Sequence, residues 1–401
     1  MSANTVLIVA QDMTSPLDRR VWLQATSLQN HGYRVFVLCP NSRMFPRITE
    51  VIDGIRIFRY PHILEGRNNL GIFLEYLIST FSIFTFEIIL GIRYKIDVLH
   101  LCNPPDFLYQ ASIGIRLLRN PKVVWDQHDV VPELWLAKKN SQKSVLYKFL
   151  AIFEKKVAKK SDLVIFASDG FQKRMFSRRV NLGNEVVVIK TSPRENFGHS
   201  QFITKLERKL QANPKITIVY LGRMGSQDGI ETLIEAFSIV LSQVSNFALE
   251  LTLIGDGPER AELEKKSRLL GSYPNTQFYG YISDESELCK LLSASDIAVC
   301  PDLPNGMNEI SSMNKVSEYL AMGLPIVQFN LEENVKTAQG CTVIAYHNNS
   351  QSLAEAMIKL INDPILRKNL SFQSRRRFLQ ALTWEVQEAK LIESYRRLLS
   401  N

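Results

Sequence analysis

Short runs of apolar, mostly β-branched residues alternate with helix-length segments along this chain of 401 residues. The runs of the first half are Val6–Ala10, Val35–Cys39, Ile55–Tyr60, Val98–Cys102, Val123–Gln127, Leu163–Ala167 and Val186–Ile189. After a polar, charged stretch at 193–211, the alternation resumes with Ile216–Leu221, Leu249–Ile254, Thr276–Tyr279, Ile297–Cys300, Ile326–Phe329 and Cys341–Ala345. Strands joined by crossover helices form parallel sheets. Because 401 residues exceed what one core usually supports, we expect two doubly wound α/β domains, with ligands outside the carboxyl ends of their strands.

The positive net charge lies in the first half of the chain. Residues 1–195 carry 27 Lys/Arg against 17 Asp/Glu, and the remainder carries 21 against 23. This asymmetry indicates that the first domain meets an anionic partner, either a membrane face or a phosphorylated acceptor, unless it is only a basic soluble surface. No nucleic acid is expected, because Lys/Arg runs such as Lys159-Lys160 are not interleaved with aromatic residues.

The five cysteines are scattered without a Cys-x-x-Cys spacing. This favours buried free thiols in a reducing compartment over disulfides or a metal site. The chain has no Asp-x-Asp element and no spaced histidine pair, so no metal is expected. Because Val6–Ala10 follows the start without a basic leader or a cleavage site, we expect a cytoplasmic protein.

The segment from Leu70 to Tyr94 is strongly apolar but contains Glu75 and Glu87. Two ionised carboxylates are costly in a bilayer, so a transmembrane helix is not expected. Two interpretations remain: a helix packed within the first domain, or a helix that lies on a membrane surface or contacts a lipid-linked acceptor. The second interpretation places the protein peripherally on the inner face of the plasma membrane.

The stretch at 308–325 predicts a short helix whose start faces an anion. Ser311 or Ser312 is the expected N-cap and Gly323 the residue that ends the helix. A helix start offers backbone N–H groups and a positive dipole to an anion. Glu318, further along, can accept hydrogen bonds from hydroxyl groups, and this combination suits a nucleotide sugar.

Several motifs coincide in order and spacing with those of a known family. They are Asp18-Arg19-Arg20-Val21-Trp22, Asn103-Pro104-Pro105-Asp106, His128-Asp129-Val130-Val131-Pro132-Glu133, Met224-Gly225-Ser226-Gln227-Asp228-Gly229-Ile230, Gly255-Asp256-Gly257-Pro258, Asn314-Lys315, Glu318-Tyr319-Leu320-Ala321-Met322-Gly323 and Pro325. The chain resembles the retaining glycosyltransferases of family 4, in particular the bacterial polysaccharide-assembly branch. The resemblance implies the GT-B fold of two facing Rossmann-like domains. Residues 1–192 are then the acceptor-binding domain and 193–383 the nucleotide-sugar-binding domain, with the helix at 384–401 packed back on the first domain.

The resemblance also implies roles for residues of the second domain. Glu318 holds the ribose hydroxyls, because a carboxylate can accept hydrogen bonds from two donors. Lys315 is a candidate cation for the diphosphate, with a solvent-facing lysine as the alternative. The other donor-binding candidates are Gly225, Ser226, Ser311, Ser312 and Asn314.

Two positions depart from the family pattern. Many members have a sugar-contacting glutamate where Ile310 stands here. Either a one-residue bulge lets the neighbouring Glu309 contact the sugar, or other groups bind the sugar hydroxyls. The family commonly carries an arginine and, five residues on, a lysine that neutralise the leaving diphosphate. Arg223 is present, but Asp228 replaces the lysine. Neutralisation is then expected from Arg223 and backbone amides, together with Lys190 or Lys315.

In the first domain the resemblance places His128 beside the transferred sugar and its phosphates, with a loop hydrogen bond as the alternative. Asp129 and Glu133 either shape the loop or contact the acceptor, and Arg19 or Arg20 steers the acceptor or a phosphate.

The expected activity is therefore retaining transfer of a sugar from a nucleoside-diphosphate sugar to a lipid-linked or saccharide acceptor in surface polysaccharide biosynthesis. The resemblance implies an enzyme without metal or cofactor, in which the sugar nucleotide is a co-substrate and no protein nucleophile is assigned. The alternatives are a sugar-nucleotide epimerase of the same fold and a non-enzymatic saccharide-binding or scaffold protein.

Overall fold

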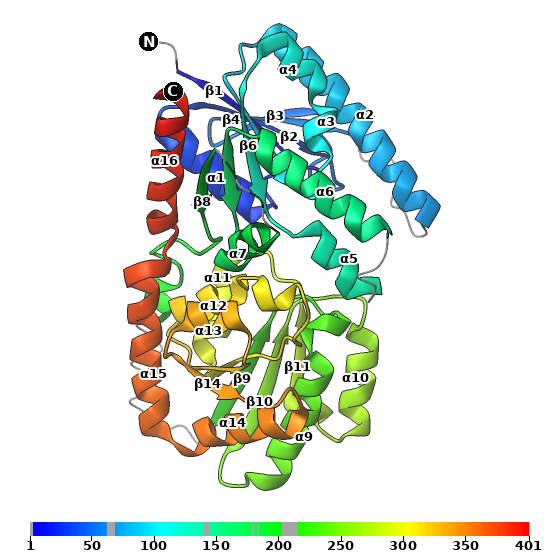
Figure 1. Cartoon of the computed structure of the whole chain (residues 1–401). Coiled ribbons are helices and arrows are strands. Elements are labelled where there is room, and N and C mark those ends of the chain that lie inside the picture. The colour runs from blue at the N-terminus through cyan, green and yellow to red at the C-terminus, as the bar shows by residue number, and fades with distance from the viewer. Residues whose placement is uncertain are drawn as a thin grey trace. The chain divides into compact units, whose positions relative to one another are not determined.

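The computed structural model describes residues 3–61, 69–139, 145–178, 180, 182, 184–202 and 215–400 (Figure 1). They divide into two compact units: unit 1 is Met1–Thr191 with Gln387–Asn401, and unit 2 is Ser192–Val386. The boundary expected from sequence falls after residue 192. Part of the expected linker, at 203–211, lies outside the described residues.

Unit 1 is built on an eight-stranded sheet in the order β3-β4-β2-β1-β5-β6-β7-β8. Its strands are β1 (Thr5–Val9), β2 (Arg34–Pro40), β3 (Thr49–Ile52), β4 (Ile55–Tyr60), β5 (Val98–Asn103), β6 (Lys122–Gln127), β7 (Leu163–Phe166) and β8 (Glu185–Val188). The strands run parallel except β3, which pairs antiparallel with β4. The strand order reverses between β1 and β5, so the carboxyl ends of these strands mark the expected ligand position.

Strand β3 was not predicted from sequence. It lies at the sheet edge and joins β4 through Asp53 and Gly54, which both have positive φ angles, 50° and 79°. An Asp-Gly pair with two positive φ angles is typical of a two-residue hairpin turn. The dipeptide was the available signal, because the strand itself alternates between exposed and half-buried residues.

Helices cover this sheet (Figure 1). They are α1 (Arg19–Asn30), α2 (Asn69–Arg93), α3 (Leu108–Ala111), α4 (Ile113–Arg119), α5 (Val131–Lys139), α6 (Val145–Lys160), α7 (Asp169–Ser177) and α16 (Trp384–Ser400). Helix α1 begins at the expected motif, because Asp18 accepts a hydrogen bond from the Val21 amide. From Gln387 onward α16 belongs to unit 1, and the Tyr395 hydroxyl lies 2.6 Å from Nδ1 of the buried His100.

Helix α2 packs closely against α4. A Cβ atom on Gly114 of α4 would lie 2.9 Å from Ile88 and 3.0 Å from Phe84 of α2, so only glycine fits this crossing. Glu87 points into unit 1, fully buried, with its Oε1 2.7 Å from Ser112 Oγ. Burial raises the pKa of Glu87 from 4.5 to about 8, so this carboxyl group is mostly neutral at pH 7.

We expect Glu87→Gln to change how stability depends on pH. Folded Glu87 keeps its proton up to about pH 8, whereas the unfolded chain releases it near 4.5, so wild-type stability falls as the pH rises between these values. Glutamine is neutral throughout. The free energy of unfolding of the variant, relative to that of the wild type, should therefore increase as the pH rises, by about 2 kcal/mol or more at about pH 8. Urea unfolding at several pH values, with the exposed Glu262→Gln as control, measures this. A difference that does not vary with pH would contradict the neutral carboxyl group.

Unit 2 contains a six-stranded parallel sheet in the order β11-β10-β9-β12-β13-β14. Its strands are β9 (Lys215–Leu221), β10 (Ala248–Ile254), β11 (Thr276–Gly280), β12 (Ile297–Cys300), β13 (Ile326–Phe329) and β14 (Thr342–Ala345). Its helices are α9 (Ile230–Gln243), α10 (Arg260–Leu269), α11 (Glu285–Ala294), α12 (Asn314–Ala321), α13 (Glu332–Ala338), α14 (Ser350–Asn362) and α15 (Pro364–Arg377). The strand order reverses between β9 and β12, which places the expected ligand position of this unit at their carboxyl ends.

Two apolar clusters fill the two faces of this sheet. Phe237 of α9 and Met357 of α14 belong to one cluster, and Leu292 of α11 and Leu320 of α12 belong to the other. The buried residues of α12 fix this helix against the sheet beside the strand-order reversal.

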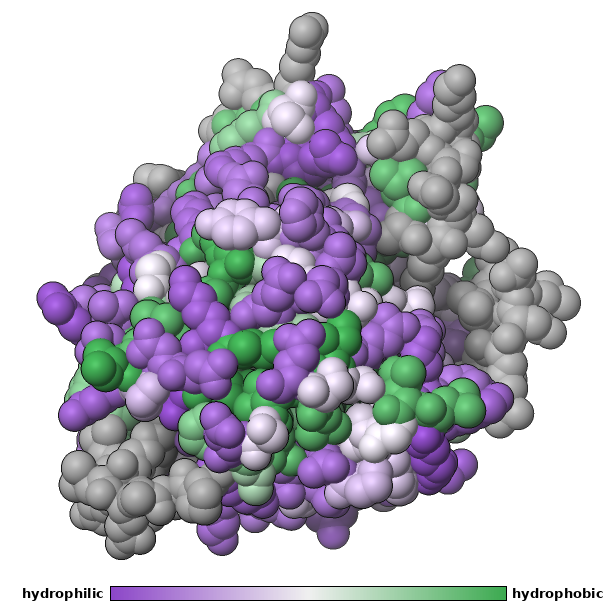
Figure 2. Space-filling model, turned by 90° about the horizontal axis from the view of Figure 1, so that it is seen from below, coloured by the Kyte–Doolittle hydropathy of each residue, from purple (hydrophilic) through white to green (hydrophobic). Residues whose placement is uncertain are grey.

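Seen from below, the surface is mainly hydrophilic, with hydrophobic residues showing between the polar ones (Figure 2).

Candidate functional site

Lys315 lies beneath the carboxyl ends of β9 and β12. Its Nζ atom is 2.7 Å from Asp302 Oδ1 and 3.4 Å from the Tyr220 hydroxyl, and it lies over the Tyr220 ring at 4.6 Å from the centroid. The residue is 8% exposed, so the solvent-facing alternative is wrong. Burial lowers the pKa of Lys315, but the Asp302 carboxylate, together with Tyr220 and Cys300, outweighs it and holds this pKa well above its ordinary value. Unit 2 therefore has a permanent cation at its strand-order reversal.

The carboxylates around Lys315 are only partly satisfied. Oδ2 of the buried Asp302 has no hydrogen-bond partner among the described residues. Asp228, where the family pattern has a lysine, accepts a hydrogen bond from the Gly225 amide at 3.0 Å. Burial raises the pKa of Asp228, while Lys315 lowers it. The Arg223 side chain is exposed next to this group.

The start of α12 differs from the prediction. The helix begins at Asn314 with Met313 as its N-cap, and no side chain caps it. Ser311 Oγ instead donates to the Met307 carbonyl at 2.7 Å, and Ser312 Oγ lies 3.4 Å from Thr337 Oγ1. The predicted serine cap is wrong, because α12 begins at Asn314, the Ser311 hydroxyl bonds within its own turn, and the Ser312 hydroxyl lies beside Thr337 of α13.

Glu318 follows Lys315 by three residues, so both side chains lie on one side of α12. Glu318 is 7% exposed. The Tyr319 hydroxyl accepts a hydrogen bond from the Leu221 amide at 2.7 Å and lies 3.4 Å from the Val299 carbonyl. This tyrosine ties α12 to β9 and β12, which holds Glu318 at the edge that the sequence predicted for the donor.

Two loops meet at the same edge. The buried Asn308 side chain donates to the Gln227 carbonyl at 3.1 Å and to the Leu303 carbonyl at 2.8 Å. Because Gln227 lies in the turn Ser226–Asp228, this bond brings the loop of Glu309 beside Gly225 and Ser226. Glu309 itself is exposed on the turn Asn308–Ile310. Its contact with a sugar stays a prediction.

In unit 1, Asp126 at the end of β6 is the centre of a buried hydrogen-bond network. It accepts bonds from Arg20 at 2.9 and 2.6 Å and from the Gln24 amide at 2.8 Å. The Nε2 atoms of His128 and His100 lie 2.8 and 3.6 Å from its Oδ2. Burial alone raises the pKa of Asp126, but Arg20 and then His128 hold it well below its ordinary value. We call these five residues the Asp126 hub.

Two members of the hub were predicted as site residues. The His128 side chain is 17% exposed, and its backbone amide donates to Asn103 Oδ1 at 2.6 Å. Its ring is thus held in place while one side stays accessible. Arg20 is 6% exposed, and its Nη1 also donates to the Ile189 carbonyl at 2.7 Å. Arg20 therefore joins Asp126 to the segment after β8 and is not presented to an acceptor or a phosphate.

The remaining candidates of unit 1 lie around this hub. Glu133 is fully buried and forms ion pairs with Arg174 and Arg178, so it shapes the loop rather than contacting an acceptor. Lys190 Nζ lies 3.1 Å from Asp169 Oδ2. The Asp129 carbonyl accepts a hydrogen bond from the Asn103 side chain at 2.8 Å. Arg19, at the first turn of α1, is half-buried.

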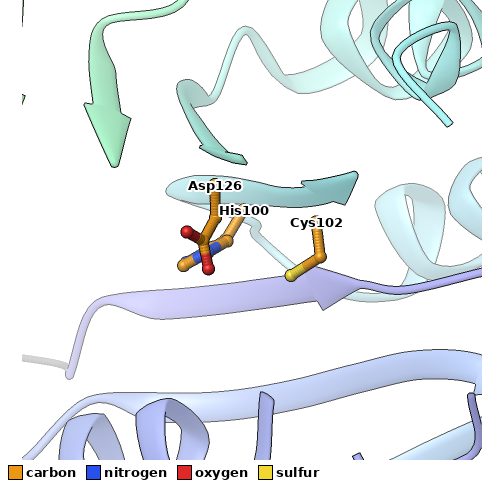
Figure 3. Close-up of side chains that lie close together, drawn as sticks. All are labelled: His100, Cys102 and Asp126. Carbon is orange, nitrogen blue, oxygen red and sulfur yellow. The ribbon is translucent and has the colours of Figure 1, made fainter. Parts of the chain in front are cut away.

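His100, Cys102 and Asp126 lie within 4.8 Å of one another, close enough to resemble a metal site (Figure 3). Both Asp126 oxygens already bind the Arg20 guanidinium, and the pKa of Cys102 is raised well above its ordinary value, first by burial and then by Asp126. A protonated thiol and a carboxylate that is paired with arginine are poor metal ligands. The group fits a structural hydrogen-bond hub better than a metal centre.

Asp126 and Asp302 are absent from the residues predicted from sequence. Each is an acid within or directly after an apolar run, and a buried charge needs a partner. That pattern was the available signal, but the partners Arg20 and Lys315 are 106 and 13 residues away. Only the fold brings them together.

Two family models match this chain. The model described as Glycosyltransferase Family 4 matches residues 17–192, and the model described as Glycosyl transferases group 1 matches residues 215–363. The chain belongs to glycosyltransferase family 4. One match of this family-4 chain falls in each unit, and the family predicted from the motifs is confirmed.

Two curated relatives of the family-4 chain are named for capsular polysaccharide biosynthesis and for a phosphatidylinositol dimannoside. The capsular polysaccharide biosynthesis glycosyltransferase CapM of Staphylococcus aureus is 24% identical over 238 residues, covering 56% of this chain and 60% of the relative. A GDP-mannose-dependent alpha-(1-6)-phosphatidylinositol dimannoside mannosyltransferase of Mycobacterium tuberculosis is 23% identical over 245 residues, covering 61% and 60%. The matches thus span about 60% of the length of these relatives.

Solved structures share the fold over the full chain. Sucrose-phosphate synthase from Thermosynechococcus elongatus superposes with a TM-score of 0.78 at 17% identity, covering 99% of both chains. The lipopolysaccharide glycosyltransferase WaaG gives 0.68 at 14% identity, covering 96% of this chain and 98% of WaaG. Anabaena HepE, solved with UDP-glucose, gives 0.71 at 14% identity, covering 98% and 99%. The predicted α/β GT-B fold is confirmed.

Proposed function

We propose that this protein transfers a sugar, with retention, from a nucleoside-diphosphate sugar to a lipid-linked or saccharide acceptor in surface polysaccharide biosynthesis. The observation that carries the proposal is the group at the strand-order reversal of unit 2, where Lys315 and Glu318 lie on one side of α12 beside the exposed Arg223. The family match and the names of the relatives support the same function.

Two parts of α12 bind different parts of the donor. The Glu318 carboxylate accepts hydrogen bonds from the ribose hydroxyls. The diphosphate lies near the uncapped start of the helix, where backbone N–H groups and the dipole favour an anion. Gly225 and Ser226 border the diphosphate from the facing turn, which the Asn308 side chain holds close.

Arg223 and Lys315 neutralise the charge of the leaving group. The departing nucleoside diphosphate gains about one negative charge, and a preorganised cation near it stabilises the transition state by several kcal/mol. Asp228 removes one cation from the usual pattern and adds a carboxylate 3.0 Å from the Gly225 amide. Lys315 remains charged because Asp302 holds its proton, so the site retains a buried positive charge without a metal ion.

Unit 1 supplies the acceptor side in this proposal. His128 is the candidate of unit 1 for binding the transferred sugar or its phosphates, because its side chain is 17% exposed and the Asp126 hub fixes the ring. In the reaction the bond between the anomeric carbon and the diphosphate breaks, and a bond to the acceptor oxygen forms on the same face. The acceptor proton leaves with the diphosphate, so no protein base is required, and because the acceptor itself attacks on that face, no protein nucleophile is assigned.

Incubation with a panel of nucleoside-diphosphate sugars, with and without lipid-linked and saccharide acceptors, tests the proposal. We expect acceptor-dependent release of nucleoside diphosphate that persists in EDTA, and a glycosylated product whose anomeric configuration by NMR matches the donor. Conversion of the sugar nucleotide without acceptor would identify an epimerase. No binding of any sugar nucleotide by calorimetry would indicate a scaffold and contradict the proposal.

A further inference from the structure

One side of helix α2 is apolar and exposed along the length whose side chains are described. Its exposed residues are Leu74, Leu77, Phe81, Ile89 and Ile92, whose side chains are 39%, 55%, 71%, 53% and 65% exposed. At 100° per residue they occupy one side of the helix, and the buried residues Ser79, Ile83, Glu87 and Leu90 occupy the opposite side. Helix α2 therefore packs on unit 1 with one side and turns an apolar stripe to the outside.

Helix α4 continues this surface. Ile113, Leu117 and Leu118 are 51%, 82% and 48% exposed. A Cβ atom on Gly91 of α2 would lie 3.2 Å from Leu118, next to the exposed Ile92, so the stripes of the two helices adjoin (Figure 1). We define the α2–α4 face by these eight exposed residues of the two helices.

Charge is placed at one end of the α2–α4 face. Between Leu77 and Ile92 the ionisable residue of α2 is Glu87, which is buried within the unit and mostly neutral at pH 7. At the carboxyl end of the stripe, Arg93, Lys95 and Arg119 are exposed. An apolar stripe with basic residues at its end is complementary to acyl chains and anionic headgroups.

Helix α6 of the same unit repeats this chemistry. Val145, Phe149 and Ile152 are 84%, 57% and 66% exposed at the start of the helix, and Lys156 and Lys159 are exposed after them. The one acid of α6, Glu154, is buried and paired with Arg178. Unit 1 thus has two helices with exposed apolar residues and a basic end.

We propose that unit 1 docks on the surface of a bilayer that contains anionic lipids through the α2–α4 face, with α2 lying in the plane of the interface. The segment Leu74–Arg93 is long and apolar enough to cross a membrane, but its other side is packed on unit 1, which fits lying on the surface and not spanning it. The docking stands on this face alone. Its use, bringing the enzyme to a lipid-linked acceptor, rests on the proposed function.

A bilayer explains the face better than a second copy of the chain. The cations at the end of the face have no exposed acid within α2 or α4 to meet in a symmetric partner. Lys95 is already paired with Asp97 at 2.7 Å, and lipid headgroups can supply negative charge to Arg93 and Arg119 along the whole interface. Sedimentation with vesicles distinguishes the two partners.

Sedimentation of the full chain is measured with vesicles of phosphatidylcholine alone and mixed with phosphatidylglycerol. We expect binding to the mixed vesicles that weakens with salt. The triple variant Leu77→Ser, Phe81→Ser, Ile92→Ser should reduce that binding at least about tenfold. The matched control, Leu269→Ser, Ile365→Ser, Phe372→Ser, removes one exposed leucine, isoleucine and phenylalanine from unit 2 and should bind as the wild type does. Circular dichroism and melting curves establish that both variants are folded.

Two further readouts keep the outcomes distinct. Transfer to a water-soluble acceptor should be unchanged in the α2 triple variant, because the three replaced residues belong to unit 1 and none of them is a donor-site residue of unit 2. Binding of the wild type to vesicles without any sugar transfer would leave docking standing and overturn only the proposed function. Unaltered vesicle binding of the triple variant would overturn the docking. The docking would also be overturned if light scattering showed a wild-type dimer that does not bind vesicles and that dissociates in the triple variant. The face would then join two copies of the chain.

Discussion

Replacing Glu318 by alanine should weaken donor binding at least about 100-fold while the protein stays folded. A carboxylate that accepts two hydroxyl bonds contributes about 1.5–3 kcal/mol per bond, and 100-fold corresponds to about 2.7 kcal/mol. Alanine suits the interior of α12, and Tyr319 still ties the helix to β9 and β12. Calorimetry with the donor that supports transfer measures the loss.

Glu262→Ala is the matched control for this experiment. Glu262 is 78% exposed on α10 of the same unit. Its removal should leave the donor dissociation constant unchanged. Wild-type donor affinity in Glu318→Ala would contradict the contact between Glu318 and the ribose. Loss of donor affinity in both variants would indicate a general effect of charge.

Replacing Asp126 by asparagine should lower the free energy of unfolding by about 3–5 kcal/mol. The substitution leaves the Arg20 guanidinium, 6% exposed, without its anionic partner, and an uncompensated buried charge is costly. It also removes the negative charge beside the His128 ring, whose Nε2 lies 2.8 Å from Asp126 Oδ2. Denaturant unfolding measures the stability, and transfer at a temperature where the variant is folded measures the effect through His128.

A double-mutant cycle with Arg20→Met separates the pair from its surroundings. If the two charges are coupled as the geometry indicates, the double variant should be more stable than the sum of the single losses predicts. Simple additivity, or a loss below about 1 kcal/mol in Asp126→Asn, would show that the hub is not held by this pair.

The strands could be predicted from sequence because their signal is local. Every predicted apolar run matches a strand to within one residue at each end of the run, since β-branched runs between turn residues need no knowledge of distant partners. The edge strand β3 was missed because it is half-exposed and lacks such a run. The predicted end of α12 at Gly323 is also confirmed, where the φ angle of 57° favours glycine.

The site was predictable only in outline. Motif spacing placed Glu318 and Lys315 on one helix, and the fold puts that helix beside the strand-order reversal of unit 2. The expected role of Arg20 failed because this residue depends on a partner far along the chain, Asp126. The serine cap of α12 failed because Ser311 bonds the nearby Met307 carbonyl and Ser312 lies beside the distant Thr337. Pairings between distant residues leave no mark in local sequence.

The most direct test of this account is the structure of the protein with its nucleoside-diphosphate sugar bound. We predict the nucleotide at the carboxyl ends of β9 and β12, with ribose hydroxyls bonded to the Glu318 carboxylate and the diphosphate at the start of α12 near Arg223 and Lys315. A nucleotide bound elsewhere, or bound there without contact to Glu318, would contradict the account.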